Sequence, residues 1–215
     1  MTDELRRFRR ALREQLLARR SALAESQRAA AQAAVVAQLR RLVPLLPPGP
    51  LAFYWPIRGE IDLRPFAAEL VAAGRVVALP VILAAKTPMI FRQWTPQTPM
   101  QRGVWDIPVP EPDERVSPRV VILPVVGVDQ EGYRLGYGGG YYDRTLPTLT
   151  PPPLRIGVGY AFARIATIQP QPHDQRLDLL VNEAGIAWFL RDASSDECSL
   201  PSTLVPGTDN KLRPD

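Results

Sequence analysis

The feature that most constrains the fold is the apolar run from Val120 to Val126, in which Pro124 is the only interruption among valine, isoleucine and leucine. A short continuous run rich in β-branched residues predicts a strand that is buried on both faces. Proline cannot donate a ladder hydrogen bond, so we expect this strand to bend or end at Pro124. It is the strongest strand pattern in the chain.

Strand and helix patterns alternate along the rest of the sequence. Apolar residues recur every three to four positions from Leu5 to Arg20, and Ser26 offers an N-cap to a second helix that reaches Leu46. Further strands are predicted at 51–55, 75–83, 89–94, 155–160 and 186–190, with helices at 62–73 and 141–146 and a Pro-rich connection at 95–118. This alternation predicts a mainly parallel sheet with helices on both faces. We expect one α/β domain over 1–191 and a polar, disordered tail over 192–215.

Composition excludes several classes of protein. Hydrophobic residues make up 46% and charged residues 22%, which is typical of a globular chain, and no apolar stretch approaches the eighteen or so residues of a membrane span. The N-terminus has no secretory pattern, and the single cysteine, Cys198, cannot form an internal disulfide. We therefore expect a cytoplasmic protein, without a membrane partner, and a monomer.

The net charge of +4 is a weak signal for nucleic acid. The arginines gather before residue 42 on alanine-rich helices, where such a pattern is usually a solvated face. A positive field also raises the local concentration of a small polyanionic substrate. We expect small-molecule substrates and no nucleic acid; a nucleic-acid module remains the alternative, although the interleaved aromatic residues of single-strand binders are missing from this region.

Between Leu135 and Asp143 the chain carries four glycines in five positions, Gly136, Gly138, Gly139 and Gly140. Closely spaced glycines permit positive φ and let backbone N–H groups converge on an anion before a helix. Arg134 adds a charge suited to phosphate, and Asp143 follows at a position where a carboxylate can hold a phosphate-bound Mg²⁺. The loop predicts a phosphate site, with a tight structural turn as the alternative reading.

Two familiar phosphate loops are excluded. A Walker-type loop requires Lys-Ser/Thr after the glycines, and that pair is absent. In a G-x-G-x-x-G pattern that begins at Gly136, the third glycine is replaced by Tyr141, and no acidic residue follows about twenty residues later. The glycines alone therefore indicate phosphate near a helix N-terminus and nothing more specific.

The residues around the loop are more specific. Arg-Leu-Gly-x-Gly-x-Gly-Tyr-Tyr-Asp, from Arg134 to Asp143, resembles the signature of the 5-formyltetrahydrofolate cyclo-ligase family, also called methenyltetrahydrofolate synthetases. Other segments agree with the family in the same order: 9–13, 54–56, 59–62, 105–108 and 172–174, with Asp178 beyond. The resemblance covers roughly residues 5 to 187. It implies a three-layer, Rossmann-like domain in which ATP and folate meet over the glycine loop.

The resemblance also implies a reaction. Members of the family convert 5-formyltetrahydrofolate and ATP to 5,10-methenyltetrahydrofolate, ADP and phosphate. The formyl oxygen attacks the γ-phosphate, the folate N10 closes the ring, and phosphate departs. No protein nucleophile is needed, because catalysis consists of positioning and charge stabilisation. This agrees with a chain that holds one histidine and no nucleophilic triad.

Site residues follow from the same resemblance. The implied ATP-binding residues are Arg9, Arg13, Arg134, Gly136, Gly138, Gly139, Gly140, Tyr141 and Tyr142. The implied folate-binding residues are Trp55, Glu60, Tyr137, Gly138, Gly139, Gly140 and Tyr141, with Trp105 as a further aromatic contact. Asp143 and Asp174 are the implied Mg²⁺ ligands. Arg9 and Arg13 are four residues apart, which places them on one helical face.

Each of these residues also has a purely structural interpretation. Trp55 and Trp105 are equally well explained as core residues, Glu60 as a turn residue, and Asp174 as the cap of a turn. His173 follows a proline in a loop, so we expect it to be structural or solvated rather than a general base. Arg9 stands where the family has lysine, so its phosphate contacts must differ, and a relative with another substrate or without activity remains an alternative.

Overall fold

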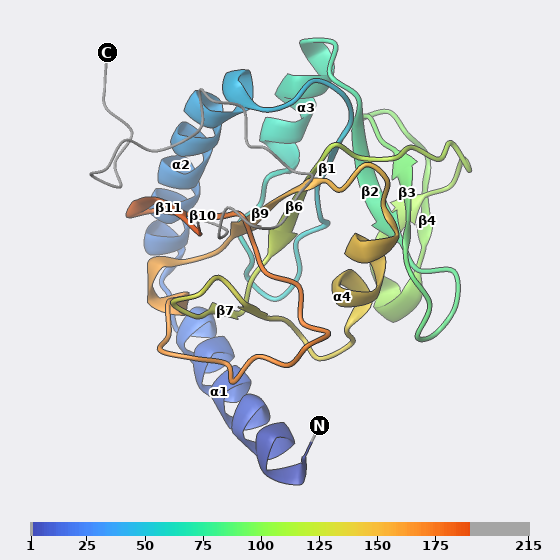
Figure 1. The fold of residues 1–215 in the computed structure, drawn as a ribbon. Helices are drawn as coiled ribbons and strands as arrows, with labels where there is room; N and C mark the ends of the chain where they lie inside the picture. The colour runs from blue at the N-terminus through green and yellow to red at the C-terminus, as the bar shows by residue number, and fades with distance from the viewer. Residues whose placement is uncertain (1, 190–215) are drawn as a thin grey trace.

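A seven-stranded sheet forms the centre of the computed structural model, which describes residues 2–189 (Figure 1). The predicted tail at 192–215 lies outside the described residues. The helices are α1 (Asp3–Ser21), α2 (Glu25–Leu42), α3 (Arg64–Ala72) and α4 (Tyr141–Thr145). The strands are β1 (Leu51–Ala52), β2 (Val77–Val81), β3 (Ile90–Gln93), β4 (Met100–Arg102), β5 (Pro108–Pro110), β6 (Val120–Pro124), β7 (Gly127–Val128), β8 (Arg134–Leu135), β9 (Leu154–Val158), β10 (Leu179–Asn182) and β11 (Gly185–Trp188).

The strand order in the central sheet is β11-β10-β9-β6-β1-β2-β3. The inner strands pair in parallel, with Leu51 opposite Val77 on one side and Val120 on the other. The two edge strands, β3 and β11, run antiparallel to their neighbours. Two small antiparallel ribbons, β4-β5 and β7-β8, stand apart from this sheet. The predicted mainly parallel sheet is confirmed.

Helices cover both faces of the sheet, which confirms the three-layer prediction. Residues of α2 and α3 pack with the alternating side chains Leu51, Val120 and Ile122 on one face. The other face carries Ala52, Val121 and Leu123, and it is covered by the segment around α4. Because β6 is buried on both faces, its sequence is continuously apolar rather than alternating. No helix in the described range is long and apolar enough to cross a membrane.

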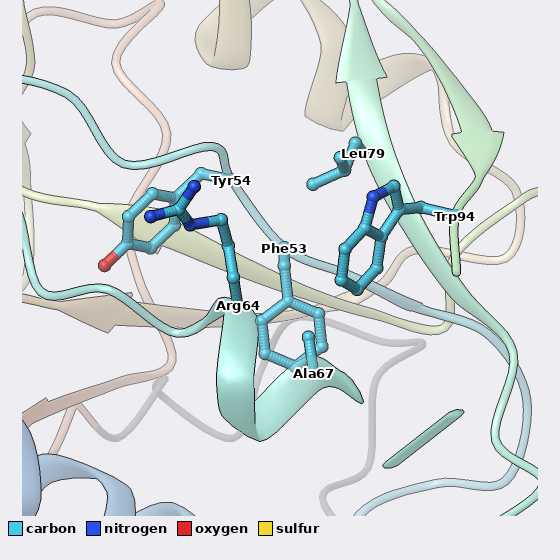
Figure 2. Close-up of a pocket in the computed structure, with 6 residues that line it drawn as sticks. All are labelled: Phe53, Tyr54, Arg64, Ala67, Leu79 and Trp94. Atoms are coloured by element: carbon cyan, nitrogen blue, oxygen red, sulfur yellow. The ribbon is translucent and has the colours of Figure 1, made fainter. Parts of the chain in front are cut away.

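The layer between α3 and the sheet is closely packed. Figure 2 shows Phe53 between Ala67 of α3 on one side and Leu79 of β2 and Trp94, directly after β3, on the other. The cavity left among these side chains has a volume of about 10 Å³, which is close to the minimum for a single water molecule. This cavity therefore holds nothing larger than water, and the ligand site must lie elsewhere.

The main elements begin and end close to their predicted positions, with local corrections. Ser26 was predicted to cap α2, but the helix already begins at Glu25, where the Gln27 side chain accepts a hydrogen bond from the Ala24 N–H at 2.9 Å. The third helix begins at Arg64, two residues after the predicted start, and the carboxylate of Asp62 accepts the Arg64 N–H at 2.9 Å. As expected, β6 ends at Pro124.

Three strand features were not predicted. The buried strand β10 was missed, although Leu179 to Val181 is fully apolar. The ribbons β4-β5 and β7-β8 were also missed, because two- and three-residue strands leave almost no periodic pattern. The β7-β8 ribbon matters for the site, since it lies in the sequence between the central strand β6 and the glycine loop and ends directly before that loop.

The order of the strands fixes where a ligand can bind. From β1 the chain first adds β2 on one side and later returns to place β6 on the other side. In an open parallel sheet, such a reversal leaves a crevice beyond the carboxyl ends of the two diverging strands. The segments that follow β1 and β6 are those around Trp55 and the glycine loop, so the topology brings the predicted site segments to one place.

Candidate active site

A cleft of about 1020 Å³ lies at the carboxyl ends of β1, β2 and β6. Its size is at the upper end for a ligand site, so it has room for two substrates of ordinary size. Every residue predicted for the site lines it: Arg9, Arg13, Trp55, Glu60, Arg134, Gly136, Tyr137, Gly138, Gly139, Gly140, Tyr141, Tyr142, Asp143 and Asp174. The structure therefore gathers segments that are up to 165 residues apart in the sequence.

The glycine loop requires glycine for two reasons. Gly138 and Gly140 have φ values of 94° and 63°, in the left-handed region that other residues rarely adopt. A Cβ added to Gly139 would lie 2.9 Å from the Tyr141 ring. Around Gly136, by contrast, an added Cβ would meet nothing within 4 Å, so the backbone there faces open space. The loop is a tight turn and also leaves room for a ligand; the two interpretations do not exclude each other.

Charge in the cleft is strongly positive. Of the described residues that line it, six are arginines and three are carboxylates. The helix that follows the glycine loop, α4, has only five residues, so its dipole adds little to the positive potential. Any attraction for an anion here comes mainly from arginine side chains and exposed backbone amides.

Arg134 and Asp143 form an ion pair beside the loop. The Nη2 of Arg134 donates to Oδ2 of Asp143 at 3.2 Å, and the Gln175 N–H donates to the other carboxylate oxygen, also at 3.2 Å. The guanidinium also lies over the Tyr142 ring, 5.1 Å from its centre. Burial raises the pKa of the Tyr142 phenol above its ordinary value, so this ring remains neutral.

Arg9 and Asp174 form a second, two-point ion pair. Two N–O contacts of 2.6 and 3.2 Å join the guanidinium to the carboxylate. Arg9 also donates to the carbonyl oxygens of Ile168 and Gln169, each at 2.9 Å, so its donors are largely occupied. Asp174 accepts the Gln171 N–H at 2.7 Å, and hydrogen bonds from Arg9 and Gln171 hold its pKa below the ordinary value against the opposing effect of burial.

Arg13 lies one turn further along α1. Its Nε donates to the carbonyl oxygen of Gly136 at 2.8 Å. Burial lowers the pKa of the Arg13 guanidinium from its very high ordinary value, and the nearby positive charge of Arg9 adds to this effect. The predicted placement of Arg9 and Arg13 on one face of the first helix is confirmed, since both line the cleft. Arg13 contacts the glycine loop, whereas Arg9 contacts the segment from Ile168 to Asp174.

Glu60 lies at the other end of the cleft, with a side chain that is only 3% exposed. Its Oε1 accepts the Tyr137 hydroxyl and its Oε2 accepts the Ile57 N–H, each at 3.0 Å. Burial raises the pKa of Glu60 to about 7, although the Ile57 N–H, Arg20 and Tyr137 all act to lower it. Glu60 thus closes a local turn, as in the structural interpretation, and also presents a titrating carboxylate to the cleft.

Aromatic rings surround the space between these two ends. Trp55 is half-buried, packs against the core and lies under the Arg64 guanidinium, 4.7 Å from the ring centre. Trp105 is 64% exposed, so its interpretation as a core residue is wrong. It meets Tyr141 edge to face, with the ring centres 5.6 Å apart. Trp105 has a φ of 58°, an uncommon backbone conformation for a bulky residue.

Several arginines at the site were not predicted: Arg6, Arg58 and Arg144 line the cleft, and Arg20 lies beside it. Arg20 is 2% exposed and donates to the Tyr137 hydroxyl at 3.0 Å, and Arg144 donates to the Gly139 carbonyl oxygen. The helical pattern around Arg20 had indicated a solvated face. His173 has a side chain that is 67% exposed, which agrees with the expectation of a solvated loop residue.

Comparison with known proteins places the chain among relatives of one kind. Residues 6–183 match the model of the 5-formyltetrahydrofolate cyclo-ligase family. The chain is 28% identical to the 5-formyltetrahydrofolate cyclo-ligase of Mycoplasma pneumoniae over 80% of its own length and 97% of the relative's. It is 30% identical to the enzyme of that name from Haemophilus influenzae, over 61% of its own length and 74% of the relative's.

Solved structures agree with the sequence relatives. The 5,10-methenyltetrahydrofolate synthetase of Aquifex aeolicus superimposes with a TM-score of 0.73 at 31% identity, and the match covers 88% of this chain and 96% of that one. The synthetase of Mycoplasma pneumoniae gives a TM-score of 0.67 at 27% identity, over 81% and 98% of the two chains. On the extent of the family match, together with these relatives, the chain belongs to the 5-formyltetrahydrofolate cyclo-ligase family.

Proposed function

We propose that this protein converts 5-formyltetrahydrofolate to 5,10-methenyltetrahydrofolate and uses ATP, which leaves as ADP and phosphate. Family membership supports the reaction. The observation that carries the proposal is that one cleft joins a glycine loop flanked by arginines to a buried carboxylate with an aromatic wall. A triphosphate and a reduced pterin are the two kinds of ligand that these surfaces suit.

The nucleotide would bind at the glycine-loop end. Arg13 and Arg134 would contact phosphate oxygens, and the backbone amides from Gly136 to Tyr142 would cradle the triphosphate. Arg9 would join them after loosening its contacts with Asp174. The surplus of arginines in the cleft supports this assignment, because a positive field stabilises both the bound polyanion and the charge that shifts during phosphoryl transfer.

The folate ring would bind at the Glu60 end. A reduced pterin presents several N–H donors on one edge, and the Glu60 carboxylate retains acceptor capacity beyond its bonds to Ile57 and Tyr137. Trp55 would supply a flat apolar wall, and Trp105 with Tyr141 would close the opposite side. In this arrangement the formyl group would face the glycine loop, so that its oxygen could reach a terminal phosphate.

The chain's residues fit a Mg²⁺ ion that is held mainly by its substrate. No group of three or more histidine, cysteine or carboxylate side chains suited to a metal occurs in residues 2–189. Mg²⁺ commonly binds one or two protein carboxylates together with phosphate oxygens and water, so such a group is not required. Asp143 and Asp174 would be the protein ligands. When bound, the ion would neutralise phosphate charge.

In the proposed reaction the formyl oxygen attacks the γ-phosphorus, and ADP leaves. N10 then attacks the formyl carbon, loses its proton to solvent, and phosphate departs with the former formyl oxygen. Protein groups bond to neither reacting centre covalently. Arg134 and Arg13 would stabilise the phosphoryl charge, while Glu60 and Trp55 would hold the pterin so that the oxygen faces the γ-phosphorus, which makes the reaction effectively unimolecular.

The decisive experiment mixes the purified protein with Mg-ATP and 5-formyltetrahydrofolate and follows the absorbance of the methenyl product. We expect product with the wild type and a loss of roughly 10²–10³-fold in rate for Asp143→Ala, because a protein ligand of the Mg²⁺ that would neutralise phosphate charge is removed. Glu114→Ala, an exposed carboxylate outside the cleft, is the matched control. Bound ATP without any methenyl product would overturn the proposal and favour a relative with another substrate.

A further inference from the structure

Arg20 lies in the last turn of α1, where arginine is usually exposed, yet its side chain is only 3% exposed. Its Nη1 donates to the Tyr137 hydroxyl at 3.0 Å and its Nη2 to the Val125 carbonyl oxygen at 2.8 Å. The Nε is buried as well and has no hydrogen-bond partner within residues 2–189. A buried guanidinium with an unsatisfied donor is an expensive way to pack a helix, so packing alone does not explain this residue.

The hydrogen bonds from Arg20 have a fixed direction. Arginine can only donate, so the Tyr137 oxygen accepts from Arg20 and its hydroxyl proton points to Oε1 of Glu60, 3.0 Å away. The Ile57 N–H occupies Oε2 from the other side. The Glu60 carboxylate is therefore held at both oxygens, and the Nη1 of Arg20 is 3.9 Å from Oε1, close enough for a direct charge interaction.

We propose that Arg20 is a positioning residue for the folate: through the Tyr137 hydroxyl it orients the Glu60 carboxylate toward the pterin and keeps it an acceptor. This inference rests on the proposed function, because it assigns Glu60 to the folate end of the cleft. It adds to that function a residue from the first helix that lies outside the cleft lining. It also gives a role to Tyr137, which lies between two glycines of the loop: its hydroxyl links the glycine-loop end of the cleft to the Glu60 end.

The charge of Arg20 matters because Glu60 is buried. Burial raises the pKa of Glu60 to about 7, and the Ile57 N–H, Arg20, Tyr137 and Arg58 act in the opposite direction. A protonated Glu60 would present a hydroxyl in place of one acceptor oxygen, which suits a pterin N–H edge less well. The titratable or charged groups that face Glu60 are Arg20 from α1, Arg58 from its own loop, Tyr137 and Tyr142 from the glycine-loop segment, Tyr54 after β1, and Tyr160 after β9.

The first test replaces Arg20 by methionine, which keeps much of the apolar length and removes the charge. We expect the KM for 5-formyltetrahydrofolate to rise roughly tenfold to a hundredfold, the range for loss of a charge-assisted hydrogen bond. The KM for Mg-ATP should change far less. The acid limb of the pH profile of kcat/KM for the folate should move to higher pH, because Glu60 then remains protonated further into the neutral range.

Two further variants separate charge from packing. Arg20→Lys restores a positive charge and should recover most of the folate affinity, whereas Arg7→Met, an exposed arginine on the same helix, should leave both KM values unchanged. In a Glu60→Gln background there is no carboxylate to hold, so adding Arg20→Met should raise the folate KM little further. The double variant contains no unpaired buried carboxylate. If Arg20→Met alone folds poorly, the effect of losing Arg20 can therefore still be measured in the Glu60→Gln background.

An equal loss of folate affinity from Arg20→Met in the wild-type and Glu60→Gln backgrounds would overturn the proposal, since Arg20 would then act only through packing. An unshifted pH profile with an unchanged folate KM would overturn it as well. Folate affinity should also be measured directly by quenching of tryptophan fluorescence. A wild type that binds the folate but forms no methenyl product would refute the proposed function, while the affinity ratio of Arg20→Met to wild type would still decide the role of Arg20.

Discussion

The two ends of the cleft use arginine in different ways. At the glycine-loop end, Arg134 and Arg9 contact Asp143 and Asp174 directly, with Nη2–Oδ2 distances of 3.2 and 2.6 Å. These carboxylates are the ones that we propose for Mg²⁺. At the Glu60 end, where we propose that the folate binds, a tyrosine hydroxyl bridges Arg20 and Glu60, and the Arg20 nitrogen remains 3.9 Å from the carboxylate.

The two ends differ in how far their side chains are already arranged for the ligand that we propose for each. If Asp143 and Asp174 hold the metal as we propose, their ion pairs with Arg134 and Arg9 must loosen, so binding there exchanges one set of charge contacts for another. At the Glu60 end, both carboxylate oxygens already accept one hydrogen bond each and keep further acceptor capacity, so no direct carboxylate–arginine hydrogen bond has to open there. An end that is already ordered loses less freedom when its ligand binds. Substitutions should therefore affect turnover at the first end and folate affinity with its pH dependence at the second.

The largest effect that we expect in a direct comparison of the two ends is that of Arg134→Met. This change removes a charge aimed at the transferring phosphoryl group and leaves Asp143 without its arginine. We expect kcat to fall by roughly 10²–10³-fold, as for the loss of one preorganised electrostatic contact in other enzymes, with little change in the folate KM. Initial rates at saturating concentrations of both substrates measure this.

Arg41→Met, on the exposed side of α2, is the matched control for loss of one positive charge. Thermal unfolding of both variants should be recorded in parallel, because Arg134 is buried and its removal is expected to lower stability. If Arg134→Met raised the folate KM as strongly as it lowered kcat, the two ends of the cleft would not be separable in the way that we describe.

The next effect concerns Glu60 and the pH dependence of stability. Its pKa is raised from 4.5 to about 7 in the folded protein, mainly by burial. The fold therefore favours the protonated form: this contribution to stability is present below about pH 4.5 and is lost as the pH rises through 7. Full ionisation lowers the free energy of unfolding by an amount on the order of 3 kcal/mol. Glu60→Gln does not titrate. Between about pH 5 and about pH 8 its free energy of unfolding should therefore not fall from this cause, whereas that of the wild type should.

Urea unfolding of both proteins at about pH 5 and about pH 8 measures the difference. All other titrating groups are shared, so to a first approximation they cancel in the comparison of the two pH dependences. The folate KM of Glu60→Gln should rise at the same time, which separates stability from function at this residue. Parallel stability curves for the two proteins would mean that Glu60 titrates near its ordinary pKa and that the folate end is less desolvated than the structure indicates.

The sequence was a good guide to the site and a poor one to what supports it. The glycine-loop motif is local, so its residues could be assigned to one cleft through resemblance. The alternation of strands and helices predicted the mainly parallel sheet but missed its strand β10. Arg20 was missed because its burial depends on Tyr137 and Val125, more than a hundred residues away. A helical pattern of arginine and alanine gives no information about partners so distant in the sequence, because the burial of a charged side chain depends on tertiary packing.

The smallest effect that we expect is that of Arg9→Lys. It also tests most directly what the Arg9–Asp174 ion pair does when a nucleotide binds. The planar guanidinium of Arg9 makes two contacts with Asp174 and two with backbone carbonyl oxygens, a geometry that the compact lysine ammonium cannot reproduce. Arg9→Lys should therefore lower the free energy of unfolding by about 1–2 kcal/mol, the value of one or two lost hydrogen bonds. Denaturant unfolding measures this.

The same variant shows what the ion pair does during binding. If Arg9 and Asp174 must separate before Mg-ATP binds, a weaker pair makes that separation easier, and the KM for Mg-ATP should fall by about two- to fivefold. If the guanidinium then goes on to hold a phosphate oxygen, as we propose, loss of that contact should outweigh the easier separation, and the same variant should raise that KM. A lower KM would mean that the Arg9–Asp174 pair only opposes nucleotide binding. A higher KM would mean that Arg9 leaves Asp174 and contacts the nucleotide itself, so that this end of the cleft, unlike the Glu60 end, rearranges around its ligand.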